Sequence, residues 1–413
     1  MTKKTDTPAI RFLGFSDTWE QRKLLEFGLA TGGTSIESEF SEDGVYKVIS
    51  IGSYSEDNVY RDQGIRAVRS DKTVNRILNK GDITMILNDK TASGNIIGRV
   101  LLIEESGVYV YNQRTERIEV DNSNYDSQFI YTMLNAPAIR DRIIKQSQGN
   151  TQIYVNWTTI SQTDYLVPQF SEQRKIGEYF ANLDHLITLH QREYEKLHNI
   201  KKSMLEKMFP KNGSNVPEIR FKGFTEAWEQ RKLGEIGSVS MCRRIFKEQT
   251  SETGDIPFYK IGTFGADPDA FISRELFEKY KSKYPYPQKG DILISASGSI
   301  GRTVEFAGNN EYFQDSNIVW LNHDERLSNP FLKCFYSVVK WAGIEGSTIK
   351  RLYNDNILNT VICMPSVPEQ KRIGLFFENL DHLITLHQRE LEKLQNIKKS
   401  MLEKMFVSEE KRK

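Results

Sequence analysis

The chain has 413 residues, of which 38% are hydrophobic and 27% are charged, and its formal net charge is +1. This length exceeds what a single core usually supports, so at least two domains are expected, and the composition excludes a disordered polyelectrolyte. The net charge near zero weighs mildly against a nucleic-acid binder. Faces of opposite charge would cancel in the sum, however, and still leave a basic groove.

The three cysteines, Cys242, Cys334 and Cys363, lie far apart and have no neighbouring ligands at zinc-binding spacing. The N-terminus is charged and has no apolar segment behind it, and no run approaches the roughly 18 consecutive apolar residues of a membrane-spanning helix. We therefore expect a cytoplasmic protein that binds no metal and does not enter a membrane.

In chain order, the first feature is a framing segment, residues 8–28, which returns as residues 217–237 with 14 of 21 positions identical. A second segment, residues 172–209, returns as residues 369–406 with 31 of 38 positions identical. Both segments recur in the same order, so the chain is a tandem duplication.

The sequence between these framing segments has diverged almost completely, but both halves have the pattern of a mixed α/β domain. Short β-branched runs predict strands at residues 45–52, 82–87, 108–112, 291–296 and 317–322. Helices are predicted around residues 125–146 and 329–341, the second with Asn329 as its N-cap. Residues 210–217 are rich in Pro, Gly, Ser and Asn, as a domain linker should be.

A few positions match between the two divergent regions. KGDI occurs at residues 80–83 and 289–292, a Gly-Arg pair at residues 98–99 and 301–302, and Tyr-x-Gln at residues 111–113 and 312–314. These fixed points indicate one fold used twice. Because both halves share KGDI and Tyr-x-Gln, these two motifs cannot specify two different targets, and we expect them to support the fold, with Trp19 and Trp228 as core anchors.

The repeated 38-residue segment predicts a long helix, because it contains no proline and its apolar residues follow the alternating spacing of a coiled-coil seam. At about 1.5 Å per residue, each helix would be about 55 Å long. The seam consists of Ile176, Phe180, Leu183, Ile187, His190, Tyr194 and Leu197, and of Ile373, Phe377, Leu380, Ile384, His387, Leu391 and Leu394. We expect the two seam histidines to fix register instead of performing chemistry.

Two such helices in one chain would most economically pair with each other. Antiparallel pairing would make them a spacer with one variable domain at each end. The alternative is that each helix binds another protein. The predicted fold is therefore two tandem α/β (α+β) domains joined by a pair of long antiparallel coiled-coil helices, with pseudo-two-fold symmetry. The expected segments are residues 1–166, 167–211, 212–364 and 365–413, which alternate between domain and helical spacer.

This arrangement resembles the specificity subunit of type I restriction-modification systems. The resemblance covers essentially the whole chain and rests on an ordered set of motifs that occurs twice. The set comprises WExxxL at residues 19–24 and 228–233, KGDI followed by Gly-rich loops, and a proline followed by Glu-Gln at residues 172–173 and 369–370. In one respect the chain departs from the family, whose domains often begin with Gly-Gly-Thr-Pro. Residues 32–35 read GGTS, and residues 241–246 read MCRRIF.

The resemblance implies a protein that reads a bipartite, asymmetric site on double-stranded DNA, one domain per half-site, with the helix pair setting the gap. Helices of about 55 Å would suit grooves one to two turns of B-DNA apart. The family's helices also dock two modification subunits, which methylate adenine from S-adenosylmethionine, and restriction subunits, which use ATP to translocate and cleave DNA. The resemblance thus implies that S-adenosylmethionine, ATP and Mg²⁺ belong to partner subunits and that this chain binds no cofactor.

Polar and basic loops are the candidate DNA contacts, because phosphates and base edges are bound by Arg, Lys, Asn, Gln and small hydroxyl side chains. In the first domain they are Lys90, Thr91, Ser93, Asn95, Arg99, Gln148, Asn150, Thr151 and Gln152. In the second domain they are Arg243, Arg244, Lys247, Ser297, Ser299, Arg302, Ser347, Thr348, Lys350 and Arg351. Ordinary solvated loops would have the same composition.

An independent enzyme is not expected. Residues 296–303, ASGSIGRT, resemble a phosphate-binding loop but lack its first Gly and its Lys. The segment SNPF at residues 328–331 matches only part of the Asn-Pro-Pro-aromatic motif of adenine methyltransferases, and no catalytic set recurs in both halves. The remaining alternative is a non-catalytic coiled-coil scaffold whose variable domains bind proteins. Binding to DNA would weaken steeply with salt, whereas an apolar protein contact would not.

Overall fold

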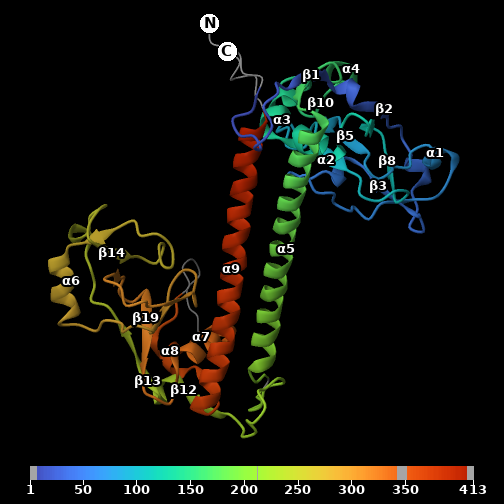
Figure 1. The fold of residues 1–413 in the computed structure, drawn as a ribbon. Helices are drawn as coiled ribbons and strands as arrows, with labels where there is room; N and C mark the ends of the chain where they lie inside the picture. The colour runs from blue at the N-terminus through green and yellow to red at the C-terminus, as the bar shows by residue number, and fades with distance from the viewer. Residues whose placement is uncertain (1–6, 212, 342–350, 407–413) are drawn as a thin grey trace. The chain divides into compact units, whose positions relative to one another are not determined.

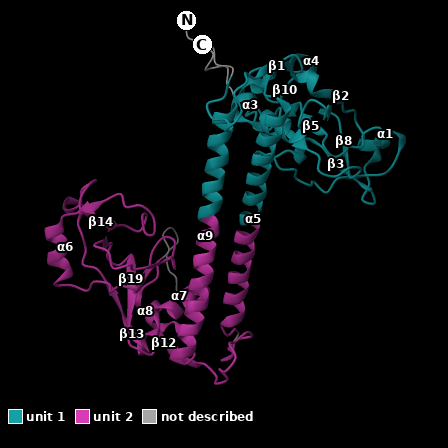
Figure 2. Cartoon of the chain, viewed as in Figure 1, with its two compact units in different colours: residues 1–191, 389–413 teal, residues 192–388 magenta. Residues whose placement is uncertain are grey.

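A computed structural model describes residues 7–211, 213–341 and 351–406 (Figure 1). The chain divides into two compact units, Met1–Gln191 with Arg389–Lys413, and Arg192–Gln388 (Figure 2). Each unit combines one mixed α/β domain with part of both long helices, α5 (Phe170–Met208) and α9 (Val367–Met405). Within the described residues, no helix is both long and apolar enough to cross a membrane.

The domain of unit 1 is built on two small sheets. An antiparallel sheet has the order β2-β9-β5-β7, and a mixed sheet has the order β4-β3-β8, in which β3 and β8 are parallel. Two short ribbons, β1–β11 and β6–β10, complete the sheet structure. The strands are β1 Glu20–Lys23, β2 Gly28–Gly32, β3 Tyr46–Ile49, β4 Arg66–Ala67, β5 Ile83–Ile86, β6 Asn88–Asp89, β7 Val100–Leu102, β8 Tyr109–Tyr111, β9 Thr115–Val120, β10 Ile153–Tyr154 and β11 Asp164–Val167. The helices are α1 Asp71–Val74, α2 Ser127–Asn135, α3 Pro137–Ile144 and α4 Trp157–Ile160.

The domain of unit 2 repeats this plan. Its antiparallel sheet has the order β13-β19-β16-β17, its mixed sheet has the order β15-β14-β18, and β12 pairs with β20. Its strands are β12 Glu229–Lys232, β13 Gly237–Met241, β14 Ile256–Tyr259, β15 Phe271–Ile272, β16 Ile292–Ser295, β17 Thr303–Glu305, β18 Tyr312–Phe313, β19 Ile318–His323 and β20 Val361–Met364. Its helices are α6 Arg274–Lys281, α7 Asn329–Val338 and α8 Asn354–Asn359. The matching strand orders confirm one mixed α/β fold used twice.

Two local predictions were wrong. The helix predicted over residues 125–146 is two helices, α2 and α3, because Ala136 takes an extended conformation and Pro137 begins the next helix. Asn329 is not the N-cap of α7. Ser328 occupies that position, and the Asn329 side chain instead bonds to His323 Nε2 at 2.6 Å.

The two ends of the predicted helix seam lie in the cores of the two units. In unit 1, Ile176, Phe180 and Leu183 of α5 belong to one core, against which Leu394, Ile397 and Met401 of α9 pack. In unit 2, Leu197 and Ile200 of α5 pack against a core that includes Ile373, Phe377 and Leu380 of α9. An ion pair between Asp184 and Lys398 in unit 1 has an equivalent between Asp381 and Lys201 in unit 2. The start of each helix therefore lies against the end of the other, which is antiparallel pairing.

A short segment at the start of each half ties the two helices together. In unit 1, the Ile10 amide donates to the carbonyl of Lys404 in α9, and the Arg11 guanidinium forms a two-pronged ion pair with Glu172 in α5. In unit 2, Ile219 and Arg220 make the same contacts with Lys207 and Glu369. Both glutamates are fully or almost fully buried, so each depends on its arginine for compensation.

The neighbouring glutamines fasten the globular domain to the helix. Gln173 accepts a hydrogen bond from the Asp126 amide, just before α2, and donates to the carbonyls of Pro168 and Asn124. Gln370 repeats this with the Ser328 amide, just before α7. The Glu-Gln pair at the start of each long helix is therefore a structural joint, which explains why both halves contain it.

One glycine in each long helix allows this joint to close. A Cβ atom added to Gly177 would lie 2.6 Å from Asp126 Oδ1, and one added to Gly374 would lie 2.4 Å from Pro330 Cβ. Real Cβ atoms do not make such close contacts, so any side chain at these positions would push α2 or α7 away from the long helix.

We predict that Gly374→Ala destabilises unit 2 by about 1 to 3 kcal/mol, the usual cost of overpacking. The direction of the change in stability is informative. A Gly→Ala substitution inside an unhindered helix would instead stabilise the protein, by about 1 kcal/mol. Urea unfolding measures the effect, with Gly262→Ala as the control, since a Cβ there would meet no heavy atom within 4 Å. A stabilised Gly374→Ala variant would contradict the close approach.

Candidate DNA interface

The two loops predicted to contact DNA in the first domain are brought together by a two-stranded ribbon. Asp89 of β6 pairs with Ile153 of β10. Lys90 follows Asp89 directly, and Gln152 precedes Ile153. The two loops therefore adjoin the same pair of opposed residues in the ribbon. Residues 90–99 and 148–152 thus belong to one surface although they lie far apart in the sequence.

The loop at residues 90–99 is held in place from beneath by a buried arginine. Arg140 in α3 donates to the backbone carbonyls of Gly94 and Ile97, both at 3.1 Å. Burial lowers the pKa of Arg140 to about 10. On the other side of the loop, the buried Asp89 carboxylate accepts the amides of Thr91 and Ile96. The loop is therefore preorganised, which lowers the entropy cost of binding.

Most of the predicted contact residues in this domain are exposed. They are Lys90, Thr91, Ser93, Asn95, Gln148, Asn150, Thr151 and Gln152. Arg99 is different, because its side chain is half-buried and bonds to Asn58 Oδ1 and, at 2.7 Å, to the Asn95 carbonyl. Burial lowers the pKa of Arg99. Arg99 therefore also supports the loop.

The second domain uses the equivalent pairing. Ser297 pairs with Arg351, as Asn88 pairs with Tyr154 in the first domain, and the Leu352 amide donates to the Ala296 carbonyl at 2.8 Å. This bridge joins the predicted loop at residues 297–302 to Arg351. Ser299, Arg302 and Arg351 are exposed, whereas Ser297 is buried and donates to Asn317 Oδ1. The predicted contacts Ser347, Thr348 and Lys350 lie outside the described residues.

The remaining predicted contacts lie on another loop of the second domain. Arg243, Arg244 and Lys247 are all exposed. The Arg243 guanidinium lies 5.2 Å from the centre of the Tyr284 ring, and that of Arg244 lies 5.5 Å from the centre of the Phe246 ring. Aromatic contacts of this kind hold a guanidinium in place without neutralising its charge.

Sequence reasoning missed Asn88 and Tyr154, which form the first-domain counterpart of the Ser297–Arg351 pair. Tyr154 is exposed, and its hydroxyl donates to Gln148 Oε1 at 3.0 Å. Tyr154 precedes Arg351 by 197 residues, the same offset that relates Glu172 to Glu369. That offset was available in the sequence and would have identified Tyr154 as the equivalent position.

The residues shared by both halves support the fold, as predicted. Trp19, Trp228, Tyr111 and Tyr312 are buried. In the two KGDI turns, the aspartates accept backbone amides, Asp82 from Asn79 and Asp291 from Gln288. The glycines of these turns have φ of +92° and +94°, values that side chains rarely adopt.

A buried carboxyl group lies beside the GGTS loop of the first domain. Arg76 holds this loop by donating to the Gly32 carbonyl at 2.7 Å and to Thr34 Oγ1 at 2.9 Å. Glu116 is 6% exposed and lies so close that a Cβ on Gly32 would be 3.2 Å from its Oε2 atom. Burial raises the pKa of Glu116 to about 7, although the charge of Arg76 opposes this shift.

We predict that the stability of unit 1 depends on pH, because the buried Glu116 carboxyl destabilises the folded state when it is ionised. Because its pKa is higher in the folded state, the group stabilises unit 1 fully only below the unfolded pKa near 4.5 and loses this contribution as the pH rises through about 7. Glu116→Gln should therefore be more stable than the parent at pH 8, by about 2 kcal/mol, and nearly equal to it at pH 5.

Urea unfolding at the two pH values measures this difference. Glu105→Gln is the control, since Glu105 is an exposed carboxylate of the same unit. Parallel pH profiles for Glu116→Gln and the parent would contradict the prediction.

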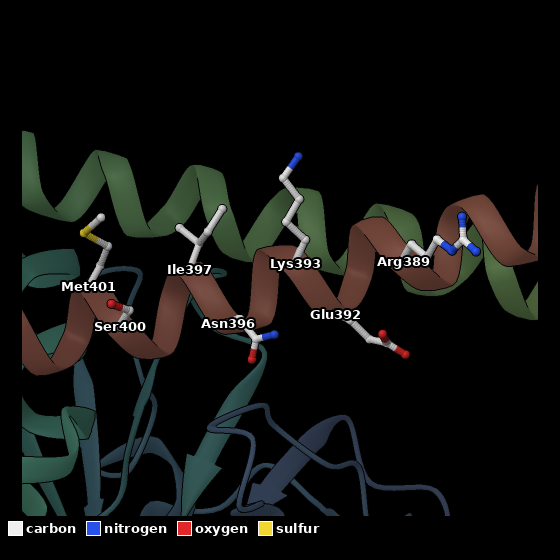
Figure 3. Close-up of a pocket in the computed structure, with 7 residues that line it drawn as sticks. All are labelled: Arg389, Glu392, Lys393, Asn396, Ile397, Ser400 and Met401. Atoms are coloured by element: carbon white, nitrogen blue, oxygen red, sulfur yellow. The ribbon is translucent and has the colours of Figure 1, made fainter. Parts of the chain in front are cut away.

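Helix α9 carries a shallow groove whose lining does not resemble a catalytic site. The groove has a volume of about 520 Å³, lies in unit 1, and is lined by one face of α9 alone (Figure 3). Its lining residues are Arg389, Glu392, Lys393, Asn396, Ile397, Ser400 and Met401. Within the described parts of the chain, no group of three or more His, Cys, Asp or Glu residues is placed to hold a metal ion.

Two duplicated α/β domains, each joined to a long helix and each presenting polar loops, define a class of DNA specificity protein. Residues 16–199 and 225–396 match the family described as "Type I restriction modification DNA specificity domain". These two matches cover most of the chain, so the protein belongs to this family.

Individual relatives agree with this assignment. The S subunit of a type I restriction-modification system from M. genitalium has the same fold, with a TM-score of 0.66, 17% sequence identity, and coverage of 97% of this chain and 99% of that one. The MjaVIII specificity subunit of Methanocaldococcus jannaschii is 20% identical over 346 residues, which are 79% of this chain and 78% of that protein.

A putative type I restriction enzyme specificity subunit of Haemophilus influenzae is 60% identical over 158 residues. That match spans 37% of this chain and 41% of the H. influenzae protein. The high identity is thus confined to part of each chain.

Proposed function

We propose that this chain is the sequence-reading subunit of a type I restriction-modification complex, and that each domain reads one half of a bipartite, asymmetric DNA site. The main support is the equivalent backbone pairing in the two domains, a short ribbon in the first and a bridge in the second. The same backbone pairing presents the exposed Tyr154 in one domain and the exposed Arg351 in the other. A shared frame with unlike side chains suits two domains that read unlike sequences, because base edges are distinguished by the donors and acceptors they meet.

The loops around each of these pairings supply the other contacts. Exposed Lys90, Arg302 and Arg351 suit phosphates or guanine, and exposed Asn95, Gln148 and Gln152 suit adenine. The chain acts in the cytoplasm, and catalysis takes place in its partners. Those partners bind S-adenosylmethionine for adenine methylation, and ATP with Mg²⁺ for translocation and cleavage by restriction subunits.

The helix pair sets the gap between the half-sites. Two observations support this role. Helices α5 and α9 have 39 residues each, or about 58 Å, and they pack in antiparallel fashion within each unit. Inserting one heptad at equivalent points of both helices, after Ile187 and after Ile384, keeps the seam in phase. It adds about 10 Å, which corresponds to about three base pairs at 3.4 Å each.

Mapping methylated adenines across a genome tests both statements. The chain and its modification subunit are expressed together, with and without the two heptads. We predict one bipartite motif for the parent and the same half-sites with a gap about three base pairs longer for the variant. An unchanged gap would show that the length of the helices does not set the spacing of the half-sites. The absence of any motif from a folded complex would favour the alternative of a scaffold whose variable domains bind proteins.

The outer faces of the long helices are the docking sites for two modification subunits. Leu186 and Leu189 of α5 are 40% and 47% exposed, and their equivalents in α9, Leu383 and Leu386, have the same values. Leucines at i and i+3 form one apolar patch on a helix surface. The same patch occurs once in each unit, which suits two copies of one partner.

We predict that Leu186→Lys with Leu189→Lys removes one modification subunit from the complex, and that the equivalent changes at Leu383 and Leu386 remove the other. A lysine ammonium in a desolvated apolar contact cannot keep its hydration. Native mass spectrometry measures the stoichiometry. The control is Leu375→Lys, because Leu375 is 57% exposed but its equivalent in α5 is Glu178, so it belongs to no repeated patch. Two subunits bound to every variant would overturn this docking site.

A further inference from the structure

One loop of unit 2 combines an exposed aromatic ring with several cations. Phe246 is 50% exposed, and Arg243, Arg244 and Lys247 beside it are also exposed. Within the described residues, none of these three cations forms an ion pair with a carboxylate, whereas Lys260 and Arg274 in the same domain both do. The loop also contains Glu248, so it presents apolar surface and an excess of positive charge at the same place.

Contacts within the loop hold Phe246 in its exposed position. Its amide donates to Gln249 Oε1 at 2.9 Å, and its carbonyl accepts the Gln249 amide at 3.0 Å, at the start of a 3₁₀ turn, Lys247–Gln249. Three residues earlier, the Arg243 carbonyl accepts the buried Tyr312 hydroxyl at 3.1 Å. Ile245 packs against the core of the domain. Anchored on both sides, Phe246 is presented outward in a fixed geometry.

The matching loop of unit 1 has the opposite character. The same 3₁₀ turn occurs in unit 1, at Glu37–Glu39, but there it follows Ile36, which is buried, whereas in unit 2 it follows the exposed Phe246. Glu37, Ser38 and Glu39 form the turn in place of Lys247, Glu248 and Gln249. Between the preceding strand and the turn, unit 1 has Gly33, Thr34 and Ser35 before Ile36, and no arginine. The fold therefore does not require an aromatic ring or cations here, and their presence belongs to the second domain alone.

We propose that Phe246 inserts between two adjacent base pairs in or beside the DNA half-site read by unit 2, while Arg243, Arg244 and Lys247 contact the flanking phosphates. This inference rests on the proposed function. Apolar side chains that wedge into a base step commonly work beside Arg and Lys, because insertion unstacks the bases and the cations hold the deformed backbone. DNA suits this combination, because its stacked bases offer apolar surface to the exposed ring and its phosphates offer negative charge to the cations beside it.

Fluorescence of 2-aminopurine tests the insertion, since the base brightens when it is unstacked. The complex of the chain with its modification subunit is bound to DNA duplexes in which 2-aminopurine is moved step by step through the half-site of unit 2, avoiding the methylated adenine. We expect brightening at one step with the parent chain. Phe246→Ala should abolish it and weaken binding about tenfold, and Phe246→Leu should retain most of it.

The control is Glu37→Ala, in the matching loop of unit 1, which should leave the fluorescence unchanged. The triple variant Arg243→Gln, Arg244→Gln and Lys247→Gln should reduce the slope of log K against log salt by about 0.9 for each phosphate that is no longer neutralised, so by up to about 3. An unchanged slope would overturn the proposed binding of phosphates by these cations.

Several results would overturn the proposal. One is brightening that persists in Phe246→Ala. Another is no brightening at any step while the parent binds its target specifically. A third is dissociation of the modification subunit from the Phe246→Ala complex, which would make this loop a protein-docking site. If the parent complex shows no preference for any DNA sequence, then the proposed function itself fails, and this outcome is distinct from the others.

Discussion

The buried ion pair at the start of each long helix is the interaction on which the rest of the structure depends. Glu172 and Glu369 have almost no solvent contact, and each forms a bidentate ion pair with one arginine, Arg11 or Arg220. Removing one partner from a buried pair typically costs about 3 to 5 kcal/mol, because the other charge is left uncompensated. The segment that contains the arginine also binds the end of the second helix, so one short stretch of chain joins two helices and a domain.

This joint explains how a protein can vary its recognition surface without losing its frame. The Glu-Gln pairs, the glycines at the domain contact and the seam all lie in the segments that the two halves share. The polar loops lie beside a ribbon in the first domain and a bridge in the second, both within the divergent regions, and their side chains take no part in the joint. Changes at Tyr154 or Arg351 therefore alter what the surface presents while the helix pair and its contacts remain intact.

Much of the frame was predictable from the sequence, because it repeats. A seam with regular spacing and a tandem duplication predict paired helices and one fold used twice, and both predictions are confirmed. Positions that depend on three-dimensional contacts were not predictable. The break between α2 and α3 follows from one alanine conformation beside Pro137, and Asn329 is diverted from capping by His323. Sequence composition singled out polar loops, and their contact with DNA stays a prediction. It did not single out Tyr154, because the place of Tyr154 beside these loops follows from its pairing with the distant Asn88.

The central claim is that the two domains read separate half-sites on a common frame, and exchanging one domain tests it most directly. Residues 29–163 are replaced by the corresponding region of a relative with a different target, while the framing segments and both long helices are kept. Methylated adenines are then mapped in cells that also express the modification subunit. The account predicts a hybrid motif in which one half-site changes and the other half-site and the gap stay the same. A change in both half-sites would contradict it.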